Sequence, residues 1–438
     1  MKALLLLFIG LTGLSCFGQQ GTGKFIADKK SGCKVWVANG YSPDDSLSIN
    51  WEGNCKNSLA EGFGTLIWYV KKKEVSRYRG FMQKGNPDGQ GKYDYGGGVI
   101  GQGIFKDGVL HGTGKVTFTD GRKLAGNFFE GEILNLDDSY LKKLQKIVIS
   151  EVDSADLYAN DNNEKALYYH ALVPDGKIKG VLVLLPGTWD RTEYVFSSNK
   201  QLVQDGFNQG IAVIVPSINQ RLVLNTQVLD FLNSAFKNAI VRYNLPHDKF
   251  VLGGFSMGGI FSLRYTEMAH ENRALTTVVP KAVYSVDGPA DLENIYKLFQ
   301  RGIEKNPTAP EPKYGINEFH TFIGGAPEQF HNKYVYYSAF SKSEADGGNA
   351  KYLKNVPTRI YNDVDVAWWL ANRGQDLYDM NALDQSAMIN FLNKLGNKDA
   401  EFINAYGKGY RLEGNRHPHS WSIVDAAECL KWINKHIQ

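Results

Sequence analysis

The sequence has little net charge, few cysteines and, beyond its first residues, no long hydrophobic run. Lys and Arg number 49 and Asp and Glu number 46, so the formal charge is +3, and no long basic block is present. A nucleic-acid partner is therefore not indicated. No later apolar run is long enough to cross a membrane. No Cys and His residues have metal-ligand spacing, so the sequence predicts no bound metal.

Residues 1–20 have the pattern of a secretory signal peptide. Lys2 precedes a short apolar run that ends at Gln19, and this run is too short for a membrane-spanning helix. We therefore expect an exported protein, periplasmic or extracellular. Lipid attachment at Cys16 is the alternative, because the residues before it resemble a bacterial lipobox, with Gly13 in place of the usual apolar residue.

Three cysteines follow this segment: Cys33, Cys55 and Cys429. An exported protein meets an oxidising compartment, where disulfides form and persist. Cys33 and Cys55 lie in the same predicted domain and are the disulfide candidates. Cys429 lies in a predicted amphipathic C-terminal helix, where we expect it to be buried.

The 438 residues predict two or three domains, and the first of them is a repeat array. Glycines recur 23 residues apart at Gly80, Gly103 and Gly126. Each unit contains an alternating run, such as 115–119, followed by a turn such as Asp120-Gly121, which is a hairpin signal. A fixed period of this size predicts stacked β-hairpins that bury their aromatic residues together.

The runs 78–91 and 101–121 resemble MORN repeats, and the resemblance covers about residues 50–133. It implies an all-β MORN-repeat domain over residues 21–134. MORN arrays are associated with scaffolding and with contacts to proteins or lipids. Two interpretations stay open here: a purely structural array, and one that contacts a protein or a membrane surface. The sequence does not indicate an oligomeric state.

Residues 135–160 predict a linker that contains a helix over 137–151, because its apolar residues recur at helical spacing. The following residues, 161–438, alternate apolar strands with helices. The expected strands are 167–173, 180–185, 211–215, 250–252, 282–286, 358–361 and 401–406. Continuous apolar strands with helices between them predict a mostly parallel, doubly wound α/β sheet.

The run Gly254-Phe255-Ser256-Met257-Gly258 lies between a short buried strand and a helix over 259–267. Small residues on both sides of a serine allow a turn so tight that the hydroxyl stands clear of the sheet. Strand, turn and helix in this order form a nucleophile elbow. Residues 160–438 therefore resemble the α/β-hydrolase fold, and the resemblance implies that Ser256 is the nucleophile.

In this family the serine is followed along the chain by an acid and then by a histidine. His419 matches the family's histidine position before the last helix, and His417 is the alternative. The acid is expected at Asp365, in the loop after strand 358–361. Asp363 and Asp287 are the alternatives, since Asp363 shares that loop and Asp287 follows the preceding strand.

An oxyanion hole requires two backbone donors. We expect one to be the Met257 N–H, directly after the nucleophile, and the other the Thr188 N–H. Thr188 lies in the loop 186–189, which resembles the family's Pro-Gly-Gly type of loop except that Thr188 replaces a glycine. The aromatic-rich insertion 291–355 is expected to form a lid or pocket wall.

Together these features predict a secreted serine hydrolase that cleaves an acyl ester or peptide bond without a cofactor. Its substrate would be a small molecule, a glycan ester or a peptide. The alternative is a catalytically inactive hydrolase fold that acts as a MORN-linked binding or scaffold protein of the cell envelope.

Overall fold

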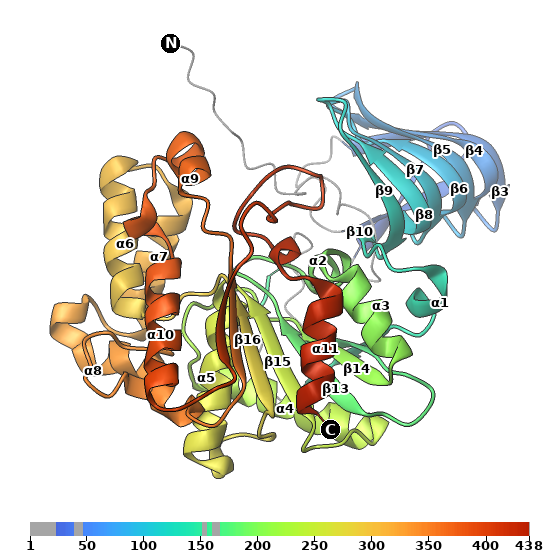
Figure 1. Cartoon of the computed structure of the whole chain (residues 1–438). Coiled ribbons are helices and arrows are strands. Elements are labelled where there is room, and N and C mark those ends of the chain that lie inside the picture. Colours follow the sequence, from blue (N-terminus) through green and yellow to red (C-terminus); the bar gives the residue numbers. More distant parts are fainter. Residues whose placement is uncertain (1–22, 39–46, 151–155, 160–166, 438) are drawn as a thin grey trace. The chain divides into compact units, whose positions relative to one another are not determined.

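The computed structural model describes residues 23–38, 47–150, 156–159 and 167–437. The predicted signal peptide and Cys16 lie outside these residues. The chain divides into two compact units, unit 1 up to Leu141 and unit 2 from Lys142 (Figure 1). Within the described residues, no helix is both long and apolar enough to span a membrane.

Unit 1 is built on one large β-sheet. Its elements are β1 (Gly23–Ala27), β2 (Lys34–Ala38), β3 (Leu47–Lys56), β4 (Leu59–Val70), β5 (Lys73–Gln83), β6 (Asn86–Asp94), β7 (Ile100–Lys106), β8 (Val109–Thr117), β9 (Lys123–Phe129), β10 (Glu132–Ile133) and helix α1 (Asp138–Leu141). From β4 to β10 each strand pairs with the next, and β3 pairs with β4. The predicted all-β region is therefore present, and the resemblance to MORN repeats stays a prediction.

The repeated glycines form one row across this sheet. Successive strands place them directly opposite one another: Gly64, Gly80, Gly91, Gly103, Gly114 and Gly126. A Cβ at Gly80 or Gly91 would collide with the ring of Tyr78, which is fully buried. The glycine row therefore leaves space for the aromatic core. The regular spacing of these glycines in the sequence follows from the regular pairing of the strands.

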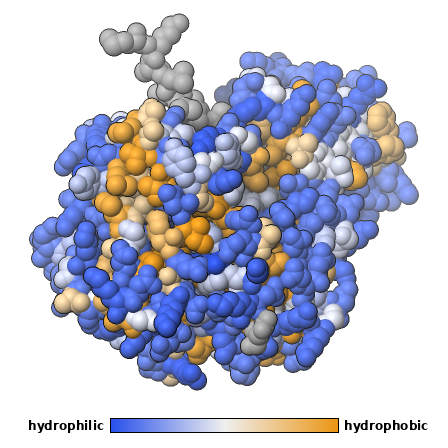
Figure 2. All heavy atoms as spheres, viewed as in Figure 1, coloured by the Kyte–Doolittle hydropathy of each residue, from blue (hydrophilic) through white to orange (hydrophobic). Residues whose placement is uncertain are grey.

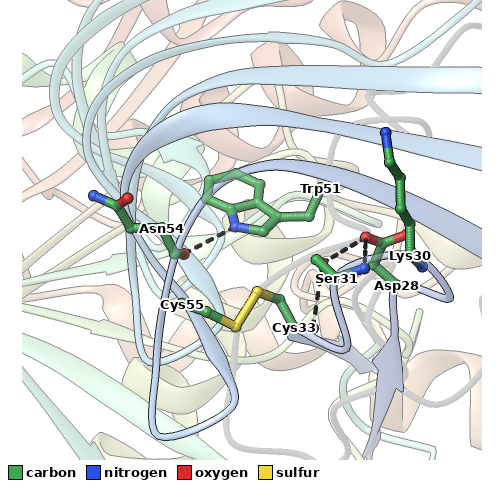
Figure 3. The surroundings of a disulfide bond; sticks show 7 residues. All are labelled: Asp28, Lys30, Ser31, Cys33, Trp51, Asn54 and Cys55. Carbon is green, nitrogen blue, oxygen red and sulfur yellow. Dashed lines mark hydrogen bonds between the residues drawn. A yellow bond between two sulfur atoms is a disulfide. The ribbon is translucent and has the colours of Figure 1, made fainter.

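A disulfide joins Cys33 and Cys55, the two cysteines predicted to pair. Cys33 precedes β2, and Cys55 lies at the end of β3 (Figure 3). Beside it, the Trp51 Nε1–H donates to the backbone oxygen of Asn54 at 3.0 Å. The bridge links the first two strands of unit 1 to its hairpin array.

The predicted helix over residues 137–151 is wrong. Only the short α1 is helical, and β11 (Gln145–Val148) is a strand that pairs antiparallel with β12 of unit 2. Ile147 and Val148 are β-branched and favour a strand once a partner strand is available. Pairing with β12 therefore stabilises a strand here more than the helical spacing of the apolar residues stabilises a helix.

Unit 2 contains a second sheet with helices on both of its faces. Its strands are β11, β12 (Tyr168–Leu172), β13 (Gly180–Leu185), β14 (Ile211–Pro216), β15 (Phe250–Phe255), β16 (Ala282–Val286), β17 (Thr358–Asn362) and β18 (Ala400–Asn404). Their order in the sheet is β11-β12-β14-β13-β15-β16-β17-β18. Neighbours from β14 to β18 run parallel, whereas β11 and β12 pair antiparallel.

The helices of unit 2 are α2 (Thr192–Ser198), α3 (Lys200–Asn208), α4 (Thr226–Tyr243), α5 (Met257–Glu271), α6 (Leu292–Lys305), α7 (Pro310–Phe322), α8 (Pro327–Tyr337), α9 (Val366–Arg373), α10 (Ala382–Lys394) and α11 (Ala426–His436). Phe236 of α4 packs on Phe250 on one sheet face, and Trp432 of α11 packs on Tyr284 on the other. The predicted insertion 291–355 folds as α6, α7 and α8 with a short 3-10 helix at Gly348–Leu353.

The carboxyl ends of parallel strands meet at one edge of a sheet. In unit 2 the segments that leave β13, β15, β16 and β17 therefore converge there, as Figure 1 shows for the central strands. These four segments contain every residue predicted for the site except the two histidines.

Candidate active site

Ser256 lies in a strained turn between β15 and α5. Its backbone has φ 53° and ψ −121°, a combination that costs energy for a residue with a side chain. A Cβ at Gly258 would collide with the backbone oxygens of Leu185 and Pro186, so this position accepts only glycine. The Ser256 N–H donates to the Val286 oxygen at 2.9 Å, which places the serine beside the end of β16.

His419 contacts the acid that follows β16. Its Nδ1 lies 2.6 Å from Asp287 Oδ2, and the two side chains are 22% and 9% exposed. A carboxylate can only accept, so Nδ1–H is the donor, and Nε2 has no hydrogen-bond partner among the described residues. The His419 ring also packs on Phe255, with centroids 4.4 Å apart, directly before Ser256. His419 thus contacts Asp287 directly and packs on Phe255, the residue that precedes Ser256.

Asp287 is held in place by amide side chains. Its Oδ1 accepts hydrogen bonds from Asn362 Nδ2 at 2.6 Å and Asn381 Nδ2 at 3.2 Å. Asn381 also donates to the Asp287 backbone oxygen. Asn362 is fully buried at the end of β17 and donates in addition to Gln385. With Oδ1 occupied in this way, Oδ2 is the oxygen that faces the imidazole.

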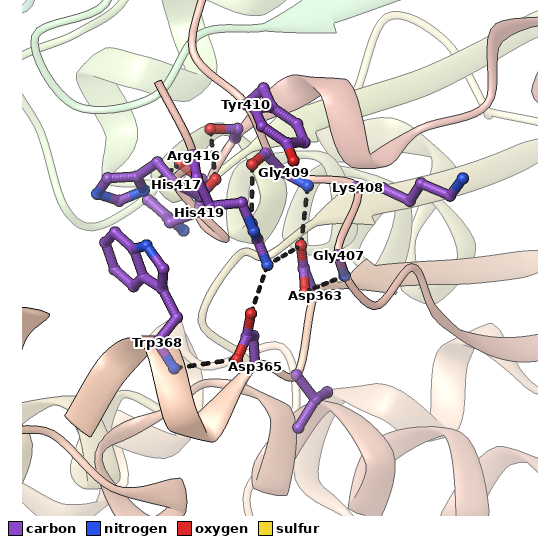
Figure 4. Close-up of polar contacts among 12 residues, drawn as sticks. Asp363, Asp365, Trp368, Gly407, Lys408, Gly409, Tyr410, Arg416, His417 and His419 are labelled. Carbon is purple, nitrogen blue, oxygen red and sulfur yellow. Dashed lines mark hydrogen bonds and ion pairs between the residues drawn. The ribbon is translucent and has the colours of Figure 1, made fainter. Parts of the chain in front are cut away.

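The predicted acid Asp365 does not contact His419. Its Oδ2 pairs with Arg416 at 2.8 Å, and its Oδ1 accepts the Trp368 N–H and caps α9 (Figure 4). The alternative Asp363 also pairs with Arg416, at 2.9 Å. Both carboxylates anchor the loop that carries the histidine. Of the three predicted carboxylates, only Asp287 contacts His419, whereas Asp363 and Asp365 both pair with Arg416.

His417, the alternative base, contacts no carboxylate among the described residues. Its Nδ1 lies 3.1 Å from the His419 backbone oxygen, and Arg373 approaches its Nε2 at 3.4 Å. Burial, followed by the positive charge of Arg411, lowers the pKa of His417 to about 2. An imidazole that stays neutral and lacks an orienting acid is a poor candidate for the base.

The two predicted oxyanion donors are backbone amides that donate to no other described residue. In the turn after β13, the Gly187 N–H donates to Asp190 Oδ2 at 3.3 Å and the Trp189 N–H donates to the Asn219 oxygen at 2.9 Å. The Thr188 N–H between them has no acceptor among the described residues, and neither has the Met257 N–H at the start of α5. Both amides are therefore available to a substrate oxygen.

Asp190 stabilises this turn in an unusual environment for a carboxylate. Burial raises its pKa to about 6, while the positive charge of Arg411 acts in the opposite direction. A raised pKa means that the neutral form is favoured in the folded state. The contribution of Asp190 to the stability of the folded state is complete below the ordinary carboxyl pKa of 3.8 and is lost as the pH rises through about 6.

Replacement of Asp190 tests this turn. Asp190→Ala removes the acceptor of the Gly187 N–H, and we expect kcat to fall by about 10- to 100-fold as the Thr188 amide loses its position. Asp190→Asn keeps an acceptor oxygen, so its kcat should fall less.

The same pair of proteins tests the raised pKa of Asp190. Relative to Asp190→Asn, the free energy of unfolding of the wild type should decrease as the pH rises from 3.8 to about 6. Urea unfolding at several pH values measures this, and an increase with pH would contradict it.

The insertion borders the same loops. Tyr314 of α7 packs on Trp189 with ring centroids 5.2 Å apart, and its hydroxyl donates to the Gln220 oxygen at 2.6 Å. Helix α9 borders the histidine loop, since the rings of Trp368 and His417 lie 4.9 Å apart. No residue of α9 is buried. Figure 2 shows hydrophobic atoms gathered over α9 and the helices beside it. An apolar surface thus adjoins the loop of His419.

Neither a second hollow nor a metal-ligand cluster competes with this site in the described residues. A surface hollow of about 510 Å³ between α3 and α11 is lined by polar and charged residues such as Asp205, Lys431 and Asn434, and it contains no predicted site residue. In the part of the chain that the structure describes, no group of three or more His, Cys, Asp or Glu side chains could hold a metal ion.

Sequence reasoning missed the residues that support the site: Asn362, Asn381, Gln385, Asp190, Asn219, Arg411 and Arg416. Most lie in loops or at strand ends, and their partners are far away along the chain. Asn362 carried one signal, since it is an amide at the end of a predicted central strand, where an unpaired polar group is costly once it is buried.

No family model matches the chain, and no curated protein matches it. Among solved structures it is similar to MPT51 of Mycobacterium tuberculosis, with 14% identity, a TM-score of 0.45, and coverage of 66% of this chain and 100% of that one. It is also similar to an S-formylglutathione hydrolase from Agrobacterium tumefaciens, with 11% identity, a TM-score of 0.41 and coverage of 67% and 95%. A third is an acylaminoacyl peptidase from Pyrococcus horikoshii, with 11% identity, a TM-score of 0.45 and coverage of 92% and 72%.

Proposed function

We propose that this protein is a serine hydrolase of the α/β-hydrolase fold. Ser256 is the nucleophile, His419 the general base and Asp287 the acid that orients His419. The observation that carries the proposal is the 2.6 Å contact between His419 Nδ1 and Asp287 Oδ2 beside the strained turn of Ser256. An imidazole oriented by a buried carboxylate next to a serine at a helix N-terminus is the arrangement that activates a hydroxyl.

The reaction proceeds through an acyl-enzyme. Ser256 Oγ attacks the acyl carbonyl carbon while His419 Nε2 takes the hydroxyl proton. The tetrahedral adduct then breaks its bond to the leaving alcohol or amine, which receives that proton from His419. Water attacks the acyl-enzyme in the same way, with His419 as base, and Ser256 is released with the acid product.

Negative charge develops on the carbonyl oxygen in both tetrahedral adducts. The Met257 and Thr188 amides, which have no acceptor within the described ranges of the chain, are suited to stabilise it. The turn that carries Thr188 is fixed through Asp190 and Asn219, so its amide needs little reorganisation during the reaction. Such preorganised donors contribute most when they are already in place before the charge appears.

Ester hydrolysis is the proposed activity, and peptide substrates are the second class that the same triad serves. Tyr314 and Trp189 border the oxyanion turn, which supports a role for the insertion 291–355 in shaping the substrate site. Export, lipid attachment and MORN-mediated contacts stay predictions from the sequence.

Covalent trapping tests the proposal. The full chain is treated with a fluorophosphonate probe, digested, and analysed by mass spectrometry. We expect one adduct, on the peptide that contains Ser256, and none after heat denaturation. The absence of an adduct on well-folded protein, or an adduct on a different serine, would reject Ser256 as an activated nucleophile. The first outcome would favour the inactive scaffold.

A further inference from the structure

Arg411 lies beside the proposed catalytic residues and forms no ion pair with any other residue that the structure describes. Its Cζ is 5.9 Å from the centroid of the Phe255 ring, and the same ring packs on His419 at 4.4 Å. The guanidinium and the proposed base therefore both pack against the Phe255 ring. The side chain is half-buried, which reduces the screening of its charge by water.

Most of the donors of Arg411 are unused. A guanidinium has five N–H donors, and among the described residues this side chain makes one long hydrogen bond, from Nη1 to Tyr194 Oη at 3.4 Å. The neighbouring Arg416, by comparison, has three polar partners. It donates to the Gly409 oxygen and pairs with Asp363 and Asp365. The same loop thus holds one arginine that anchors it and one whose donors remain available.

The carboxyl group of Asp190 lies near Arg411 but does not pair with it. Asp190 lies close enough for the two charges to interact, since Arg411 counteracts the raised pKa of Asp190, but no salt bridge joins them. Asp190 Oδ2 instead accepts the Gly187 N–H. Arg411 also lowers the pKa of His417 through space. Its positive charge therefore acts on the site without being neutralised by a direct partner.

We propose that Arg411 binds a carboxylate on the substrate, so that the preferred esters carry a negative charge a few bonds from the scissile carbonyl. A planar guanidinium matches a carboxylate through two parallel hydrogen bonds. A singly charged group suits this place better than a doubly charged phosphate, because the carboxyl group of Asp190 already interacts with Arg411. The inference rests on the proposed hydrolase function and names its substrate class.

Matched pairs of esters isolate the effect of the charge. For a carboxylate on the acyl side, the pair is para-nitrophenyl hydrogen adipate and its methyl ester. For the alcohol side, the pair is para-acetoxybenzoate and its methyl ester. Each kcat/KM is divided by the hydroxide-catalysed rate constant of the same ester, which removes differences in intrinsic reactivity.

We expect the wild type to favour the anionic member of at least one pair by about tenfold, the size of one charge-assisted contact. Arg411→Gln should reduce this ratio to about one, and Arg411→Lys should retain part of it, because the charge is kept but the paired geometry is lost. The preference should also weaken with added salt.

Lys408 provides the matched control. It is an exposed cation on the same loop, and Figure 4 shows its side chain pointing away from the contacts of Asp363 and His419. Lys408→Gln removes one positive charge but should leave the anionic-to-neutral ratio as in the wild type. Thermal unfolding curves establish that each variant is folded before its kinetics are compared.

Two results would overturn the proposal while leaving the hydrolase function intact. The wild type could hydrolyse both members of both pairs equally well, or Arg411→Gln could lower both members by the same factor. A folded wild type that cleaves none of the four esters and takes up no fluorophosphonate would instead reject the hydrolase function, and this inference with it.

Discussion

Replacing Asp287 with Asn is expected to lower kcat by about 10⁴-fold with little change in KM. Asp287 Oδ1 is already the acceptor of two amide donors, Asn362 and Asn381. The oxygen of the new amide will therefore stay with these donors, and its NH₂ group will face His419 Nδ1. Because two donors cannot share that contact, His419 must place its proton on Nε2, where it cannot accept the proton of Ser256.

Asp365→Asn is the control for this prediction. Asp365 caps α9 and pairs with Arg416, so its loss affects the loop rather than the imidazole. We expect a fall in kcat of less than about tenfold. Steady-state kinetics on one activated ester, with Ser256→Ala as the baseline, measures all three variants. A larger loss for Asp365→Asn than for Asp287→Asn would show that the assignment of the acid is wrong.

Gly258→Ala is expected to have the second large effect. The new Cβ would meet the backbone oxygens of Leu185 and Pro186, which cannot move aside as the end of a flexible side chain could. We expect a loss of stability of about 3 kcal/mol or failure to fold. Where folded protein is obtained, kcat should fall at least 100-fold, because moving Pro186 displaces the turn that carries Thr188.

Gly176→Ala is the matched control, since a Cβ at Gly176 meets nothing within 4 Å. It should match the wild type in soluble yield, melting temperature and kcat. The measurements are thermal unfolding by circular dichroism and turnover of the same ester. Wild-type stability and turnover in Gly258→Ala would mean that the elbow does not pack against β13 as described.

Local patterns were enough to predict much of the fold. The 23-residue glycine period became the glycine row of unit 1, because a sheet of consecutive hairpins repeats its register with its sequence. Strands such as Gly180–Leu185 and Ala282–Val286 were found at their observed bounds, since a buried strand is a short continuous apolar run. The failure at 137–151 arose where a partner strand, which is distant in sequence, decided the conformation.

The sequence by itself determined the turn of Ser256 and indicated His419, the histidine that contacts Asp287 in the structure. Both are set by features near them in the chain, namely small residues around a serine and a loop before the last helix. Only the tertiary structure shows which carboxylate contacts His419. Asp287, Asp363 and Asp365 all follow parallel strands and reach one sheet edge, so their chain positions are equivalent. The amides of Asn362 and Asn381 orient Asp287 toward His419, while Arg416 holds the other two carboxylates.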